Sequence, residues 1–169
     1  MKLFIPELGT ELQLTTDWHF SLYPESRNDT LAHIQGYYWY STRINGKYEE
    51  VFIPLDVEIP QYGDDHANRE AWRVFNDQKE EWFKEKIEDG TIIKDVLPVR
   101  IPRGSKLVVD RIYIRKGAKD FSSISFFLKG HEKVKTLPRH SWHQPQTRPV
   151  RFWAKLDDCN TINYKIPEE

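Results

Sequence analysis

The chain has 169 residues, enough for one sizeable domain or two small ones, with 38% hydrophobic and 30% charged residues and a net charge of −1. No apolar run approaches the roughly 20 residues of a membrane helix, and the first residues, MKLFIPELG, lack the apolar core and cleavage site of a signal peptide. The single cysteine, Cys159, excludes an internal disulfide, and no CxxC pair is present for zinc. We therefore expect a water-soluble protein of the cytoplasm.

The charge is distributed unevenly along the chain. Residues 1–62 carry 4 Lys and Arg against 9 Asp and Glu, residues 63–91 carry 5 against 9, and residues 92–169 carry 16 against 8, so the balance runs from −5 through −4 to +8. A basic C-terminal half indicates an anionic partner, or self-association with the acidic half of another copy. The alternative is that the two halves neutralise each other within the fold.

The first half reads as short strands joined by polar loops. Alternating apolar and polar residues, rich in β-branched and aromatic types, predict strands up to about residue 62. Asn45 and Gly46 lie between two such runs and predict a tight hairpin turn. The run Tyr37-Tyr38-Trp39-Tyr40 places two aromatic side chains on each side of a strand.

One long helix is predicted from about Asp65 to Asp89. Five aromatic or aliphatic residues recur at helical spacing and form one apolar stripe: Trp72, Phe75, Trp82, Phe83 and Ile87. Asp64 or Asp65 suits the N-cap, and Gly90 suits the position just past the C-terminus. The other side of the helix is charged, so we interpret the stripe as core packing.

Four short blocks recur in the same order on the two sides of this helix. They are FIP (4–6) and RIP (100–102), GTELQL (9–14) and GSKLVV (104–109), DWHF (17–20) and DRIY (110–113), and VFIPLD (51–56) and FWAKLD (152–157). We interpret them as a weak internal repeat of about 60 to 70 residues, with chance similarity between short strands as the alternative. The predicted division is a first β-barrel repeat (1–62), a connecting amphipathic helix (63–91) and a second β-barrel repeat (92–169).

Each repeat runs from a Pro and Gly turn through a strand, a long polar loop, a strand, a hairpin, a strand and a short turn. This outline resembles the SH3-like small β-barrel, which implies a mainly β (α+β) protein with two such barrels joined by the helix. The stretches LVVDRIYIRKGAKDFSSISFFL and RFWAKLDDCNTI are similar in flavour to small uncharacterised proteins of bacteriophages and plasmids. That resemblance implies a mobile-element origin and no particular activity.

The second repeat interleaves basic and aromatic residues. In DRIYIRKG (110–117), strand alternation places Ile112 and Ile114 on one side and Arg111, Tyr113 and Arg115 on the other. Cations follow a phosphate backbone, while aromatic faces stack on bases. The leading hypothesis is therefore nucleic-acid binding by a non-enzymatic protein. Its expected contacts are Arg111, Tyr113, Arg115, Lys116, Lys133, Arg139, Trp142 and Arg151.

Two other functions remain open. The acidic first repeat, with Trp18, Tyr38 and Tyr40 as contacts, suits a protein-binding module, such as a phage- or plasmid-encoded inhibitor of a host defence or nucleic-acid enzyme. The third reading is a metal-dependent hydrolase that uses His131, His140 and His143, although the spacing is not HExxH and two prolines indicate a loop. Cys159 follows two aspartates and is a poor nucleophile. We expect no cofactor.

Overall fold

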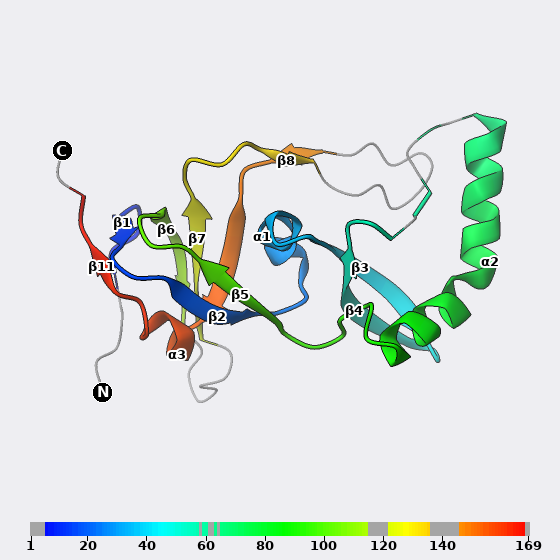
Figure 1. Ribbon diagram of the computed structural model, residues 1–169, viewed down its shortest axis with the longest axis horizontal. Coiled ribbons are helices and arrows are strands. Elements are labelled where there is room, and N and C mark those ends of the chain that lie inside the picture. Colours follow the sequence, from blue (N-terminus) through cyan, green and yellow to red (C-terminus); the bar gives the residue numbers. More distant parts are fainter. Residues whose placement is uncertain are drawn as a thin grey trace. The chain divides into compact units, whose positions relative to one another are not determined.

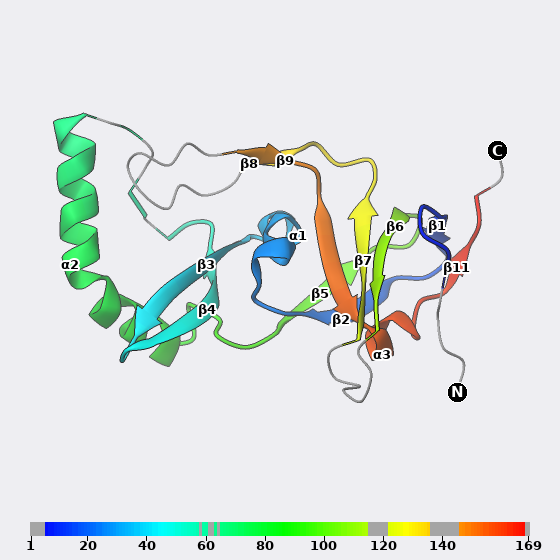
Figure 2. The same ribbon diagram turned by 180° about the vertical axis from the view of Figure 1, so that it is seen from behind.

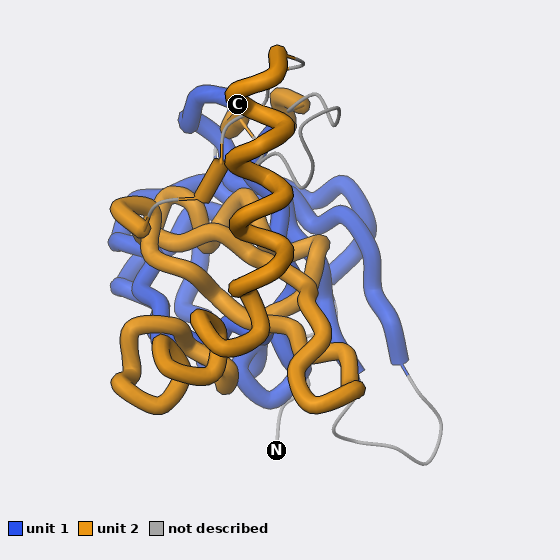
Figure 3. Tube along the Cα trace, turned by 90° about the vertical axis from the view of Figure 1, so that its right-hand side faces the viewer, with its two compact units in different colours: residues 1–23, 96–133, 149–169 blue, residues 24–95, 134–148 orange. Residues whose placement is uncertain are grey.

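The computed structural model describes residues 6–57, 59–60, 63, 65–114, 122–135 and 146–167 (Figure 1). The chain divides into two compact units, drawn in separate colours in Figure 3. Unit 1 consists of residues 1–23, 96–133 and 149–169, and unit 2 of residues 24–95 and 134–148. Each unit therefore draws on stretches that are distant in the sequence.

Unit 1 is built on a five-stranded antiparallel sheet in the order β10-β7-β6-β1-β11 (Figures 1 and 2). Its strands are β1 (Glu11–Leu14), β6 (Lys106–Tyr113), β7 (Ser123–Leu128), β10 (Arg151–Lys155) and β11 (Tyr164–Lys165). A second, two-stranded sheet pairs β2 (Trp18–Leu22) with β5 (Leu97–Ile101). The short helix α3 (Leu156–Cys159) follows β10 directly.

Aromatic side chains fill the core of unit 1. Phe126 of β7 and Phe152 of β10 lie on neighbouring strands and stack with ring centroids 5.5 Å apart. Trp18 and Phe20 of β2 pack against them, with Trp18 edge-on to Phe126 at 5.6 Å and Phe20 stacked on Phe152 at 5.4 Å. The indole Nε1 of Trp18 donates to the carbonyl oxygen of Asp158 at 3.1 Å, so its polar atom is satisfied although the residue is buried.

A bulge in β6 decides which of its side chains face outward. Leu107 and Val109 are buried, so simple alternation would turn Arg111 inward as well. The β6–β7 register instead shifts between Val109 and Arg111, which adds one residue to β6. Side chains after this bulge therefore face the opposite side from the one that simple alternation gives. Beyond the bulge Ile112 faces Ile124, whereas Arg111 and its second neighbour Tyr113 are exposed.

The predicted alternation therefore holds for residues 111–113 and not for Ile114. Ile114 was expected to face the same way as Ile112, but its side chain is 59% exposed. The strand ends at Tyr113, so strand alternation no longer fixes the direction of the next side chain. Arg115 lies outside the described residues.

Unit 2 is organised around the hairpin of β3 (Tyr37–Ile44) and β4 (Lys47–Pro54). Asn45 and Gly46 form its turn with φ of 53° and 77°, the left-handed conformation that Asn and Gly adopt most readily. The other elements of the unit are a 3₁₀ turn (Ser26–Asn28), α1 (Asp29–Ile34), α2 (His66–Glu88), and the small pair β8 (Val134–Lys135) and β9 (Thr147–Arg148).

Helix α2 begins and ends where the sequence predicts. The Asp65 carboxylate accepts a hydrogen bond from the Asn68 backbone N–H at 2.8 Å, and Gly90 follows the helix with φ 81°. Phe83 is buried and stacks on Tyr40 of β3 at 5.5 Å. The C-terminal part of α2 lies beside the hairpin, while the N-terminal part extends past it (Figure 1). These observations confirm the helix and the core role of its stripe.

The mainly β class is confirmed, and the fold consists of several small sheets, none of which closes into a barrel within the described residues. The two units do not follow the predicted boundaries at residues 62 and 92. Strand β1 of the first predicted repeat pairs with β6 of the second, and β2 pairs with β5. Backbone pairing between distant strands is set by tertiary contacts, which the block similarity did not capture. Two SH3-like repeats stay a prediction.

Candidate nucleic-acid interface

One side of the unit 1 sheet packs on the core and the other faces outward. We call the second side the outer face. It carries Lys106, Val108, Arg111 and Tyr113 from β6, Ser123, Ser125 and Phe127 from β7, and Arg151, Trp153 and Lys155 from β10. The alternation of β10 shows the two sides clearly, since Phe152 and Ala154 are buried while their neighbours on the strand are half-buried.

Two neighbouring rows of the outer face each contain one cation and one aromatic ring. In the first row Arg111 of β6 faces Ser125 of β7, which faces Trp153 of β10. In the second row Tyr113, Ser123 and Lys155 occupy the same three strands. Large side chains therefore stand on both sides of a line of serines. Strands β6 and β7 follow each other in the chain, whereas β10 comes later, after β8 and β9.

The bulge residue Asp110 neutralises one of the predicted contacts. Its carboxylate accepts a hydrogen bond from the Ser125 hydroxyl at 3.1 Å and forms a 2.8 Å ion pair with Arg151. The guanidinium of Arg151 also lies 5.8 Å from the ring centre of Phe127. Both partners of the ion pair are largely shielded from water, with side-chain exposures of 28% and 18%. Arg151 is thus held in the sheet and is poorly placed to bind phosphate.

The aromatic ring of Trp153 is held in place by Tyr23. The two rings are nearly parallel, with an interplanar angle of 11° and centroids 5.4 Å apart. The ammonium group of Lys155 lies 4.7 Å from the centre of the Tyr23 ring, a cation–π contact. Beside β10 the outer face therefore carries a stack of two aromatic rings with one cation next to it.

Acidic residues of β1 and its following loop neutralise several cations of the basic half. Lys129 lies 2.8 Å from Glu11, and Arg100 lies 2.9 Å from Asp17. The Lys129 hydrogen bond lowers the pKa of Glu11, while the Arg103 backbone N–H and then Arg100 lower the pKa of Asp17. Part of the sequence charge asymmetry is therefore cancelled within unit 1, as the neutralisation alternative predicts.

The predicted nucleic-acid contacts fall into three groups. Arg111 and Tyr113 are exposed on the outer face, and Lys133 is exposed between β7 and β8. Arg151 faces outward but is paired with Asp110. Four other predicted contacts lie outside the described residues: Arg115, Lys116, Arg139 and Trp142.

Two of the three predicted protein-binding residues belong to the interior. Trp18 is 2% exposed and packs in the core of unit 1, while Tyr40 is 5% exposed and stacks on Phe83 in unit 2. Because each ring fills its own core, neither is exposed for contact with a partner in this structure. Tyr38 is half-buried and makes a T-shaped contact with the His33 ring, with ring centroids 5.3 Å apart.

The residues considered for catalysis and metal binding give no site within the described part of the chain. No group of three or more His, Cys, Asp and Glu side chains there is arranged to hold a metal ion. His131 is exposed, while His140 and His143 lie outside the described residues. Cys159 is buried, and burial raises the pKa of its thiol, which agrees with its assessment as a poor nucleophile. Among the described helices, none has the length and apolar character needed to cross a membrane.

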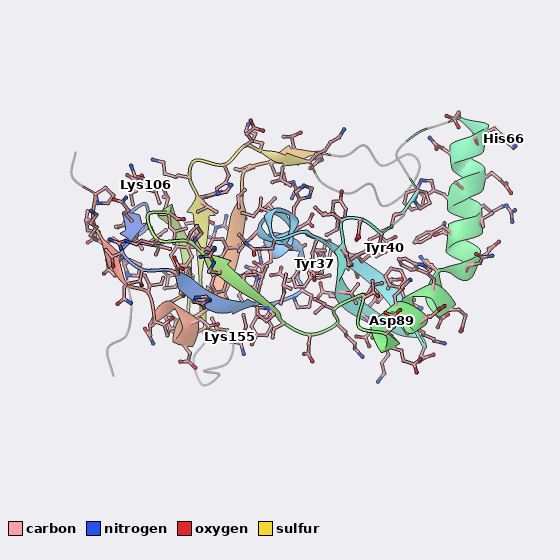
Figure 4. All side chains as sticks on the ribbon, in the orientation of Figure 1. Tyr37, Tyr40, His66, Asp89, Lys106 and Lys155 are labelled. Carbon is pink, nitrogen blue, oxygen red and sulfur yellow. The ribbon has the colours of Figure 1, made fainter. Side chains whose placement is uncertain are left out.

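Three residues on or beside the outer face were missed by sequence reasoning. Lys106 and Lys155 lie at opposite ends of the sheet (Figure 4), and Tyr23 packs on Trp153 from outside the sheet. The alternation in RFWAK (151–155) was a usable signal for Lys155, because it places that residue on the same side as Trp153. Nothing in the sequence near Tyr23 indicates that it meets β10.

No protein-family model matches the chain, and neither a curated protein nor a solved structure matches it.

Proposed function

We propose that the protein binds nucleic acid through the outer face of unit 1. The observation that carries this proposal is the pair of rows Arg111–Ser125–Trp153 and Tyr113–Ser123–Lys155, in which cations and aromatic rings alternate on one side of a sheet. Cations bind phosphates and aromatic rings stack on bases, so one surface offers both kinds of contact.

The charges of the two units support this choice of surface. Unit 1 carries 13 Lys and Arg against 10 Asp and Glu, a balance of +3, whereas unit 2 carries 12 against 16, a balance of −4. An anionic ligand is therefore attracted to unit 1 and repelled by unit 2. A protein-binding module remains the alternative function, although it needs contacts other than Trp18 and Tyr40.

Arg111 is the best-placed cation on the outer face. It is exposed and makes no ion pair with any residue that the structure describes, in contrast to Arg151 and Lys129. Lys106, at the start of β6, is also exposed and outside any described ion pair. Arg111 is therefore the cation best placed to bind phosphate, whereas Lys106 lies close enough to Glu11 of β1 for their charges to interact.

The test is binding to dye-labelled single- and double-stranded DNA and RNA across a salt series. Arg111→Glu is expected to weaken binding about tenfold or more, because it replaces a phosphate contact with a repulsive charge. Arg43→Glu is the matched control: it makes the same charge change at an exposed strand residue of unit 2. The control is expected to change affinity by less than about twofold.

Two results would overturn the proposal. One is the absence of binding by the wild-type protein to every nucleic acid at low salt. The other is an equal loss in the Arg111→Glu and Arg43→Glu variants, which would indicate attraction to overall charge with no defined surface.

A further inference from the structure

Within the part of the chain that the structure describes, the outer face has few available cations and one aromatic side chain that is more than half exposed. Among the described residues, Arg111 and Lys106 are its exposed cations outside ion pairs, since Arg151 is bound to Asp110 and Lys155 lies over the Tyr23 ring. Duplex-binding proteins commonly use many phosphate contacts, often about 6 to 10. Stacking on an exposed ring is therefore the more distinctive contact that the described part of this face offers, and it needs an unpaired base.

Tyr113 is the aromatic side chain on this face that is most open to a ligand. Its ring is 56% exposed at the end of β6, and the neighbouring Ile114 is 59% exposed. An exposed aromatic ring is an apolar surface that an unpaired base can cover. In a duplex the faces of the bases are stacked on each other and cannot reach such a ring.

Trp153 adds a second planar group on the far side of the serine row. It lies two strands from Arg111 in the register, which places the two residues about 10 Å apart across the sheet. Its stack with Tyr23 fixes the orientation of the indole before any ligand arrives. Pre-ordered side chains lose little entropy on binding.

Building on the proposed function, we infer that the ligand is single-stranded nucleic acid, held mainly by base stacking on Tyr113 with Arg111 as the adjacent phosphate contact. Stacking tolerates every base, so little sequence preference is expected. Duplex of the same sequence binds more weakly, because its bases are not available to Tyr113.

The experiment compares a labelled single strand of about 12 nucleotides with its duplex, using the full chain. The single strand is expected to bind at least about tenfold more tightly than the duplex. Tyr113→Ala is expected to weaken single-strand binding about tenfold, whereas Tyr113→Phe keeps the ring and binds within about twofold of wild type. Both variants alter an exposed side chain, so circular dichroism and thermal unfolding should match the wild type.

The outcomes separate this inference from the proposal on which it rests. Equal or tighter binding of the duplex, or no difference between Tyr113→Ala and Tyr113→Phe, would overturn the single-strand inference. If Arg111→Glu still weakened binding in that case, the nucleic-acid surface itself would stand. Absence of binding to any nucleic acid would overturn both.

Discussion

Units 1 and 2 are assembled in different ways. The sheet of unit 1 joins strands from three separate stretches of the chain, and its first strand pairs with one that lies about a hundred residues later. Unit 2 is organised by a hairpin whose two strands are joined by a two-residue turn, and by a helix that follows them in the chain. In unit 2 the paired strands β3 and β4 are neighbours in the sequence, whereas unit 1 also pairs strands that are far apart in the sequence.

The difference also appears on the surfaces. The acidic residues of β1 and its following loop lie against basic residues of the later strands, so unit 1 pairs charges that are far apart in sequence. The ion pairs of α2 instead join residues three or four positions apart, such as Arg73 with Glu70 and Asp77. Contacts between residues that are close in the sequence therefore account for more of the structure of unit 2 than of unit 1.

The largest effect is expected from truncating the aromatic cores. Phe126→Ala should cost about 3–5 kcal/mol of unfolding free energy, because it opens a cavity among Trp18, Phe152 and the strands around them. Hydrogen exchange during urea unfolding should show the loss of protection in β6, β7 and β10. Phe83→Ala should cost a similar amount, with the loss in β3, β4 and α2.

The adjacent Phe127 is the control for the core of unit 1. It lies on the outer face and is only half-buried, so Phe127→Ala should cost clearly less than Phe126→Ala. Equal costs would contradict the assignment of the two sides of β7. Loss of protection in β3 and β4 after Phe126→Ala would contradict the description of two separate cores.

A smaller effect is expected at the hairpin turn, where unit 2 depends on one local conformation. Gly46 has φ 77°, and a Cβ there meets no atom within 4 Å, so Gly46→Ala is penalised only by the backbone conformation. We expect a loss of about 1–2 kcal/mol in the free energy of unfolding, measured by chemical denaturation. Lys47→Ala, one residue later and exposed, is the control and should be nearly neutral.

The smallest effects are expected from two carboxylates whose pKa values shift in opposite directions. In unit 1, the Arg103 backbone N–H and Arg100 lower the pKa of Asp17. In unit 2, burial and the nearby Glu25 raise the pKa of Glu50. When folding lowers the pKa of a carboxyl group, its ionised form stabilises the fold at pH values above the unfolded-state pKa, which is near 3.9 for Asp. When folding raises the pKa of a carboxyl group, ionisation of that group destabilises the fold.

The free energy of unfolding, measured between acid and neutral pH, should distinguish the environment of Asp17 from that of Glu50. Asp17→Asn should be less stable than wild type at pH 7, and the difference should disappear as the pH falls through the folded pKa of Asp17. Glu50→Gln should be slightly more stable than wild type at pH 7, and its advantage should disappear below the unfolded pKa, near 4.3. If both variants were more stable than wild type at pH 7, or both less stable, the assignment of opposite pKa shifts to Asp17 and Glu50 would be contradicted.

The candidate surface was only partly predictable. Alternation correctly placed Arg111 and Tyr113 together on one side of a strand, because neighbours two apart share a side whatever the strand pairs with. It gave no information on whether that side faced the core. The pairing of Arg151 with Asp110 was also missed, since the two residues lie on strands separated by β7 in the sheet.

The amino-acid sequence by itself determined the mainly β class, the limits of helix α2 and the turn at Asn45 and Gly46, because periodicity, capping and left-handed residues act over a few positions. Only the tertiary structure decided the strand order of unit 1, the bulge that turns Arg111 and Tyr113 outward, and the burial of Trp18 and Tyr40. Those features depend on hydrogen bonds and packing between distant segments. One extra residue in β6 reverses which side chains face the solvent, and no sequence pattern within the strand predicts this bulge.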